Sequence, residues 1–157
     1  MNMKSIVVTA TIAASVMTTS AFAWTTATSD DEWRSGWGQG VAEAEVTRGS
    51  GNKIYVACES GSRRASSIHF SLAGDGPRSN EIIMIFDQGP LETISVDQNG
   101  TISSDSRAGA LNFDHVLEKL KIHNSVYIRF SDGRESTFTL KGSAKAISED
   151  CRAAFWD

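Results

Sequence analysis

The fold of this chain is constrained most by short segments in which apolar and polar residues alternate. Segments 53–59, 68–72 and 91–97 each place apolar side chains at every second position. This period is typical of β-strands that bury one face. Helix-length and strand-length segments do not alternate along the chain as they do in proteins with a parallel sheet. The sequence therefore predicts antiparallel pairing.

Further strands complete this pattern. Segment 41–47 is a weaker candidate, and segment 81–87 is apolar on both faces, as expected of a central strand covered on both sides. Asn99-Gly100 is a strong hairpin signal, and Asp132-Gly133 predicts a second hairpin between 126–130 and 138–140.

Two helices are expected between and after these strands. Phe113, Val116, Leu117 and Leu120 have helical spacing, and Asn112 is a plausible N-cap. A shorter helix is expected after Gly142-Ser143. The predicted fold class is α+β and β-rich, namely an antiparallel sheet or sandwich of six to eight strands with two short helices and one disulfide.

Residues 1–23 have the pattern of a secretory signal peptide. Lys4 precedes an apolar run over residues 6–17, and Ala21 and Ala23 fit a signal-peptidase site. That run is shorter than the about 20 residues that a membrane span requires. We expect cleavage after Ala23, a polar N-terminal arm over residues 24–40, and one β-rich domain over residues 41–157. The expected location is the periplasm or the exterior, without membrane insertion.

The chain has two cysteines, Cys58 and Cys151. Export makes a disulfide between them the expected state. On the chain-entropy model, closing a loop of roughly 90 residues stabilises the fold by about 4–5 kcal/mol. A redox-active pair is the alternative, but the Cys-x-x-Cys spacing of such pairs is absent.

The composition argues against several classes of function. A net charge of −4 is a poor match for nucleic acid, whose phosphates require a concentrated basic face. His115, Glu118 and His123 could form a surface zinc site, although polar residues on the outer face of a helix are the favoured explanation. No nucleophile elbow or paired catalytic carboxylates are recognised. We therefore expect a non-enzymatic protein with no cofactor and no metal.

The candidate binding residues are cationic or aromatic. The basic ones are Arg63 and Arg64 in a turn, and Arg129 and Arg134 in the last hairpin, where Lys121, Lys141 and Lys145 could share one face. A cationic patch on an acidic protein suits an acidic partner or an anionic surface, although ordinary solvent-exposed strand faces are the favoured explanation. Trp37 and Trp156 are the aromatic candidates, because tryptophan is enriched at binding hot spots, although each could equally be a core residue.

The C-terminal half resembles known families of exported proteins. Val126-Tyr-Ile-Arg-Phe130, Asp-Gly-Arg, Thr137-Phe-Thr-Leu-Lys-Gly142, a short helix, Cys151 and Trp156 follow in order. This order resembles the VasI-type periplasmic accessory proteins associated with type VI secretion, although four residues separate Cys151 from Trp156. The stretch Phe-Thr-Leu-Lys-Gly is also similar to the end of invasion-associated locus B proteins. Both resemblances imply an exported β domain with an accessory role.

Two binding functions are consistent with these observations, and a hydrolase is a third alternative. A hydrolase would require a cleft that contains a histidine and a carboxylate in hydrogen-bond contact. The first binding function is an envelope accessory or binding protein that contacts another envelope or secreted protein. The resemblance to the VasI-type proteins implies an association with secretion. The alternative is a periplasmic inhibitor or immunity protein that neutralises a toxin or wall hydrolase. In that case the loops Gly74–Arg78 and Ser131–Arg134 would carry the specificity.

Overall fold

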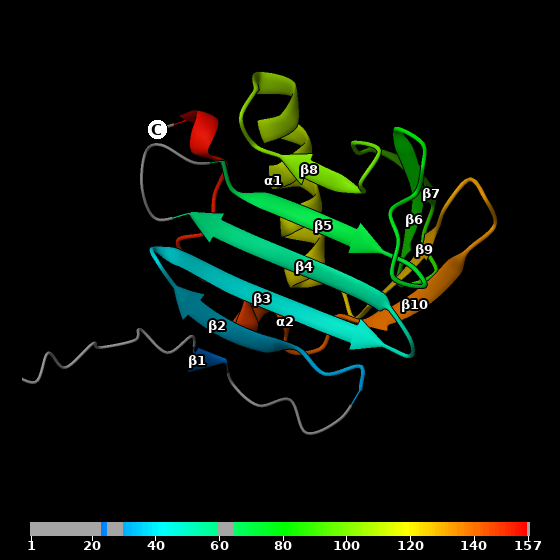
Figure 1. Cartoon of the computed structure of the whole chain (residues 1–157), viewed down its shortest axis with the longest axis horizontal. Coiled ribbons are helices and arrows are strands. Elements are labelled where there is room, and N and C mark those ends of the chain that lie inside the picture. Colours follow the sequence, from blue (N-terminus) through cyan, green and yellow to red (C-terminus); the bar gives the residue numbers. More distant parts are fainter. Residues whose placement is uncertain (1–22, 25–29, 60–64, 157) are drawn as a thin grey trace, which may run out of the picture.

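A computed structural model describes residues 23–24, 30–59 and 65–156, which form two antiparallel sheets packed with helices (Figure 1). The six-stranded sheet has the order β1 (Ala23–Trp24), β2 (Arg34–Gly38), β3 (Val41–Arg48), β4 (Asn52–Glu59), β5 (Ser67–Ser71), β8 (Thr101–Ser103). The four-stranded sheet has the order β10 (Glu135–Thr139), β9 (Ser125–Arg129), β6 (Glu81–Phe86), β7 (Leu91–Ser95). The helices are α1 (Arg107–Ile122), α2 (Ser143–Ala146) and the 3₁₀ helix η1 (Ala154–Trp156). The predicted β-rich antiparallel fold with two α-helices and one disulfide is confirmed.

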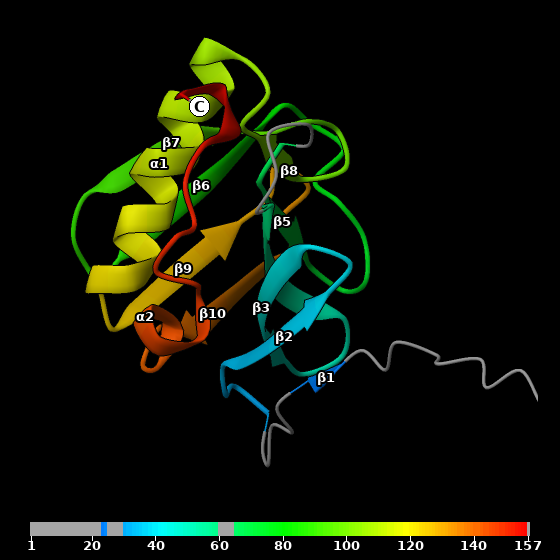
Figure 2. The same cartoon turned by 90° about the vertical axis from the view of Figure 1, so that its left-hand side faces the viewer.

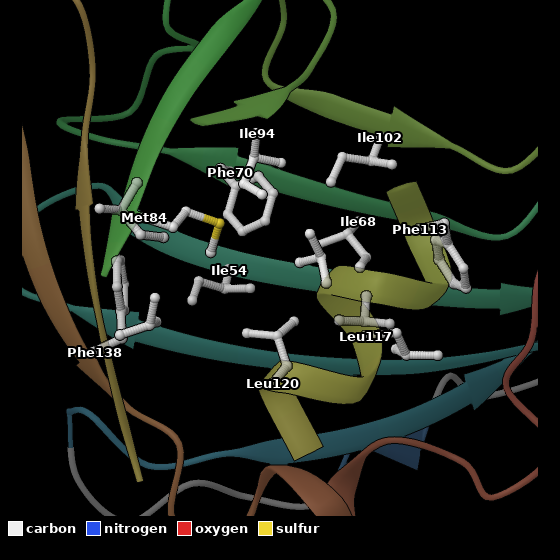
Figure 3. Close-up of a cluster of buried hydrophobic side chains, with 14 of the residues drawn as sticks. Ile54, Ile68, Phe70, Met84, Ile94, Ile102, Phe113, Leu117, Leu120 and Phe138 are labelled. Carbon is white, nitrogen blue, oxygen red and sulfur yellow. The ribbon is translucent and has the colours of Figure 1, made fainter. Parts of the chain in front are cut away.

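The alternating segments place their apolar side chains in one shared core. In β4 and β5, Ile54, Ile68 and Phe70 are almost fully buried. They meet Met84 of β6 and Phe138 of β10 from the opposite sheet (Figure 3). Period-two alternation therefore predicts correctly which side chains face the interior.

Helix α1 begins earlier than the sequence predicts. Ser106 is the N-cap, and its side chain accepts a hydrogen bond from the amide of Gly109. Asn112, the predicted cap, lies inside the helix and donates to the carbonyl of Ser95 at 2.6 Å. The buried stripe of α1 starts at Ala110, whose small side chain gave a weak periodic signal.

The Asn99-Gly100 signal is correct for the turn and wrong for the pairing. The amide of Gly100 donates to the carbonyl of Asp97 at 2.9 Å, and the Asp97 carboxylate accepts from the amides of Asn99 and Thr101. The flanking strands β7 and β8 belong to different sheets, because β8 pairs with β5. The second predicted hairpin is confirmed as the β9–β10 pair.

The six-stranded sheet extends beyond the predicted domain boundary at residue 41. Strand β2 pairs with β3 along its whole length. Trp33 is buried, and its indole Nε1 donates to the carbonyl of Thr139 at 2.8 Å. At Gly36, a Cβ atom would lie 2.8 Å from the Trp24 ring, so glycine permits close packing of an aromatic ring at this position.

The predicted disulfide is confirmed, and it joins the six-stranded sheet to the C-terminal segment. Cys58 of β4 bonds Cys151 with a Cα–Cα distance of 5.1 Å. The segment that follows lies beside α1 (Figure 2), where the amide of Ala153 and the indole of Trp156 both donate to the Asp114 carboxylate. Of the predicted signal peptide, only Ala23 lies within the described residues. Among the helices of the described ranges, none is long and apolar enough to cross a membrane.

Candidate functional site: the outer face of the four-stranded sheet

The predicted basic residues are not gathered on one surface. Arg63 and Arg64 lie outside the described residues. Arg129 projects from the outer face of β9, whereas Lys121 of α1 donates to the carbonyl of Ser148 at 3.1 Å. Lys141 and Lys145 are exposed before and within α2.

Arg134 has a structural role at the tip of the β9–β10 hairpin. Its guanidinium donates to the carbonyls of Leu72 at 2.5 Å and Gly76 at 2.6 Å, and it pairs with the Asp132 carboxylate at 2.6 Å. The guanidinium also lies 5.1 Å from the Phe130 ring centroid. Arg134 therefore ties the hairpin tip to the loop between β5 and β6. Its hydrogen bonds hold the pKa of Asp132 below the ordinary value.

The two candidate tryptophans lie in separate places. Trp37 is in β2 near the edge of the six-stranded sheet and is 62% exposed. Trp156 is in η1 beside α1, is 49% exposed, and donates to Asp114. Neither lies on the four-stranded sheet, where Arg129 is found.

The outer face of the six-stranded sheet is polar and internally paired. The strand register aligns Arg34, Glu45, Tyr55, His69 and Thr101 in one row across five strands. Arg34 forms an ion pair with the buried Glu45, and His69 contacts Thr101 at 3.2 Å. Burial lowers the pKa of His69, which favours its neutral form.

The outer face of the four-stranded sheet has a different character. Its register aligns two rows of side chains that cross all four strands. We define these two rows as the docking face: Thr137, Tyr127, Ile85 and Leu91 in the first row, and Glu135, Arg129, Ile83 and Thr93 in the second. Leu91 is 55% exposed, so an apolar side chain stands in solvent beside two partly buried isoleucines. Such apolar surface is a common mark of interaction sites.

The docking face is hollowed between its rows. A hollow of about 680 Å³ is lined by Ile83, Ile85, Leu91, Tyr127 and Arg129, among other residues. A second hollow of about 440 Å³ adjoins it, and Ile83 and Arg129 border both. Arg129 therefore lies at the junction of the two hollows. A partner side chain that enters either one would pass close to this cation.

Two hydrogen-bonded groups hold the rim of the larger hollow. The Tyr127 hydroxyl donates to the Glu135 carboxylate at 2.5 Å, and this bond raises the pKa of Tyr127. On the opposite side, Asp87 and Gln88 form the β6–β7 turn with φ angles of 47° and 63°. The Asp87 carboxylate accepts from the amides of Asn124 and Ser125 at 3.0 and 2.8 Å. The rim is thus fixed to β9 on both sides.

The histidines considered as zinc ligands contact different carboxylates. His115 bonds Glu92 at 2.8 Å, and His123 bonds Asp87 at 3.0 Å. Lys119 also contacts Glu92, at 2.5 Å. Within the described part of the chain, no three potential metal ligands are gathered at one point.

Sequence reasoning selected Arg129 but missed the apolar residues around it. The signal was present in segment 81–87, which is apolar on both faces. That pattern predicted a strand covered on both sides, and β6 is indeed an inner strand of its sheet. Only one face of β6 is covered, since Ile82 and Met84 are buried whereas Ile83 and Ile85 are partly exposed. The apolar residues on the open side of β6 are therefore partly exposed to solvent.

Comparison with known sequences gives a family for this chain. The sequence profile of the YfjT family matches residues 31–147. The chain belongs to the YfjT family. No curated protein and no solved structure matches it.

The YfjT match includes the whole docking face. The matched span begins before β2 and ends after α2, so β6, β7, β9 and β10 all lie within it. Cys58 is inside the span, while Cys151 and Trp156 follow it. The docking face is thus part of the YfjT domain itself.

Proposed function

We propose that this YfjT-family protein is an exported, non-enzymatic binding protein of the cell envelope. The N-terminal pattern over residues 1–23 supports export. The Cys58–Cys151 disulfide is typical of an oxidising compartment such as the periplasm. The weak likeness of the C-terminal half to secretion-associated accessory proteins is consistent with this role.

One observation supports binding through the docking face. Ile83, Ile85 and Leu91 form an apolar surface on the outer side of a sheet whose other side already covers the core. On the outer face of the six-stranded sheet, Arg34 is paired with Glu45 and His69 with Thr101, so these polar groups are less open to a partner. We infer a protein partner that places an apolar side chain in the hollow and a carboxylate near Arg129.

Affinity capture from envelope extracts tests this proposal. The tagged mature protein is expected to recover a defined envelope component, and Leu91→Asp is expected to lose it because a charge enters the hollow. Ile122→Asp is the matched control, because Ile122 is 65% exposed on α1 and does not line the hollow. Equal recovery by both variants, or no recovery at several salt concentrations, would contradict binding through this face.

A second candidate function, inhibition of a toxin or wall hydrolase, is favoured by a different observation. The two loops considered as specificity elements are joined into one tip, because Arg134 binds the carbonyls of Leu72 and Gly76. A fixed tip suits insertion into an enzyme cleft, since it loses little conformational freedom on binding. Arg78, which is 78% exposed at the side chain, would lead this contact.

The inhibitor function has its own test. We expect capture of a single wall-degrading enzyme or toxin whose activity falls when the protein is added. Arg78→Glu should then reduce inhibition, whereas Leu91→Asp should leave it unchanged. The reverse pattern would favour the docking face and contradict insertion of the tip.

A further inference from the structure

The outer edge of β7 carries backbone groups without partners. The amide of Val96 donates to the carbonyl of Asn80 at 2.9 Å, toward β6, whereas the carbonyl of Ser95 accepts from Asn112 on the opposite side. Successive residues of a strand direct their N–H and C=O groups to alternate sides. The N–H and C=O of Thr93 therefore point away from β6. Within the described residues, neither group has a hydrogen-bond partner.

This open edge borders a groove. A depression of about 780 Å³ lies between β7, β8 and the first half of α1. Its lining includes the buried core residues Ile94 and Ile102 and the side chain of Leu111, which is 58% exposed. The groove thus offers apolar contacts beside unpaired backbone donors and acceptors.

The facing strand does not compete for these groups. At β8, the amide of Thr101 donates to the Asp97 carboxylate at 2.8 Å, and its carbonyl accepts from the amide of Asp97 at 2.9 Å. At Gly109 a Cβ atom would lie 2.1 Å from the carbonyl oxygen of Ser103, so α1 packs directly on the next free position of β8. Of the two described strands that line the groove, β7 is therefore the one that offers both an open N–H and an open C=O at one residue.

We propose that the edge of β7 binds one extended segment of a partner protein, which adds a fifth strand to the four-stranded sheet. Strand addition satisfies the Thr93 backbone groups, and alternate side chains of the segment would face Ile94 and Leu111. These side chains would be apolar. Because α1 and β8 border the same groove, we expect an extended segment to enter it more readily than a second whole domain. This site goes beyond the docking face, although Thr93 belongs to both: its side chain lies on the docking face, and its backbone groups form the edge.

Selected peptides provide the test. A displayed library of ten-residue peptides is panned against the full mature protein, and the enriched peptides are resynthesised with N-methyl groups at every second residue. If the peptide binds as an added strand, N-methylation at one set of alternate residues should abolish binding. N-methylation at the set shifted by one residue should preserve binding. The amide of Thr93 should become protected from hydrogen exchange in the complex. Equal effects of both methylated sets, or failure to enrich any peptide, would overturn the proposal.

Variants of the protein give an independent readout. Thr93→Pro removes only the outward N–H, which proline tolerates at an edge, and should weaken peptide binding about tenfold. Thr93→Val keeps that N–H and should bind normally. Leu111→Ser should weaken binding, whereas Ile122→Ser, on the same helix outside the groove, should not. Unchanged binding by Thr93→Pro, or a dimer that Thr93→Pro dissociates, would overturn binding of a partner segment. Leu91→Asp tests the docking face separately.

Discussion

Single charged residues hold the turns that border the docking face. Asp87 joins the β6–β7 turn to the start of β9 through the amides of Asn124 and Ser125 and a contact with His123. The hydrogen bond from the Asn124 amide is the largest cause that lowers the pKa of Asp87, to about 2, from an ordinary value of 3.8. The folded protein therefore favours the ionised form of the Asp87 carboxylate.

This pKa predicts how stability depends on acid. A depressed folded-state pKa stabilises the fold above the unfolded value and loses that effect as the pH falls toward the folded value. Unfolding free energy should therefore decline between about pH 4 and pH 2. Asp87→Asn should flatten part of this decline, because asparagine tolerates the positive φ at residue 87 but carries no charge. Denaturant unfolding at a series of pH values measures the slope, and identical slopes would contradict the anchoring role.

At the scale of elements, the close contact between α1 and β8 requires a glycine, which has no side chain, at the point where they meet. Gly109 lies in the first turns of α1, where a Cβ atom would lie 2.1 Å from the carbonyl oxygen of Ser103. Helix propensity alone favours alanine over glycine by about 1 kcal/mol. The close approach of the two backbones outweighs this preference, since an alanine side chain at residue 109 would force the helix away from the strand.

Substitution at this position distinguishes the two effects. Gly109→Ala should destabilise the protein by about 1–3 kcal/mol, the usual cost of overpacking. Ala108→Gly, at the exposed neighbouring position, should cost about 1 kcal/mol through propensity alone. Chemical denaturation of both variants provides the comparison. A more stable Gly109→Ala protein would show that the helix does not rest on β8.

The elements also show where sequence reasoning succeeds and where it stops. Alternation predicted β4, β5 and β7, because period two reports burial directly. The start of α1 was missed, since Ala110 contributes little apolar area. The partner of β8 was missed because the Asp97–Gly100 turn fixes a local reversal and not the sheet that each strand joins.

For the whole molecule, the Cys58–Cys151 bridge joins the C-terminal segment to the six-stranded sheet. Both cysteines are buried, and their sequence separation is 93 residues. The sequence predicted this pairing because only two cysteines are present. The sequence did not predict the docking face. Which side of β6 is buried depends on the elements that pack against it, and the local sequence pattern of a strand carries no information about those elements.

The bridge makes a clear prediction for global stability. Replacing both cysteines with serine should remove about 4–5 kcal/mol on the chain-entropy model. The melting temperature measured by calorimetry should fall sharply, and the native protein treated with reductant should fall to a similar value. A double variant that melts at the native temperature would contradict the stabilising role of the bridge.

Photo-crosslinking in cells tests whether the outer face of β6, β7, β9 and β10 binds an envelope protein. A photoreactive amino acid is placed at Leu91 on this face and, as the control, at Ile122 on α1; both native side chains are more than half exposed. We expect one discrete adduct from position 91, which is lost when Arg129→Glu is added, and no adduct from position 122. Adducts of equal yield from both positions, or none from position 91, would contradict binding through this face.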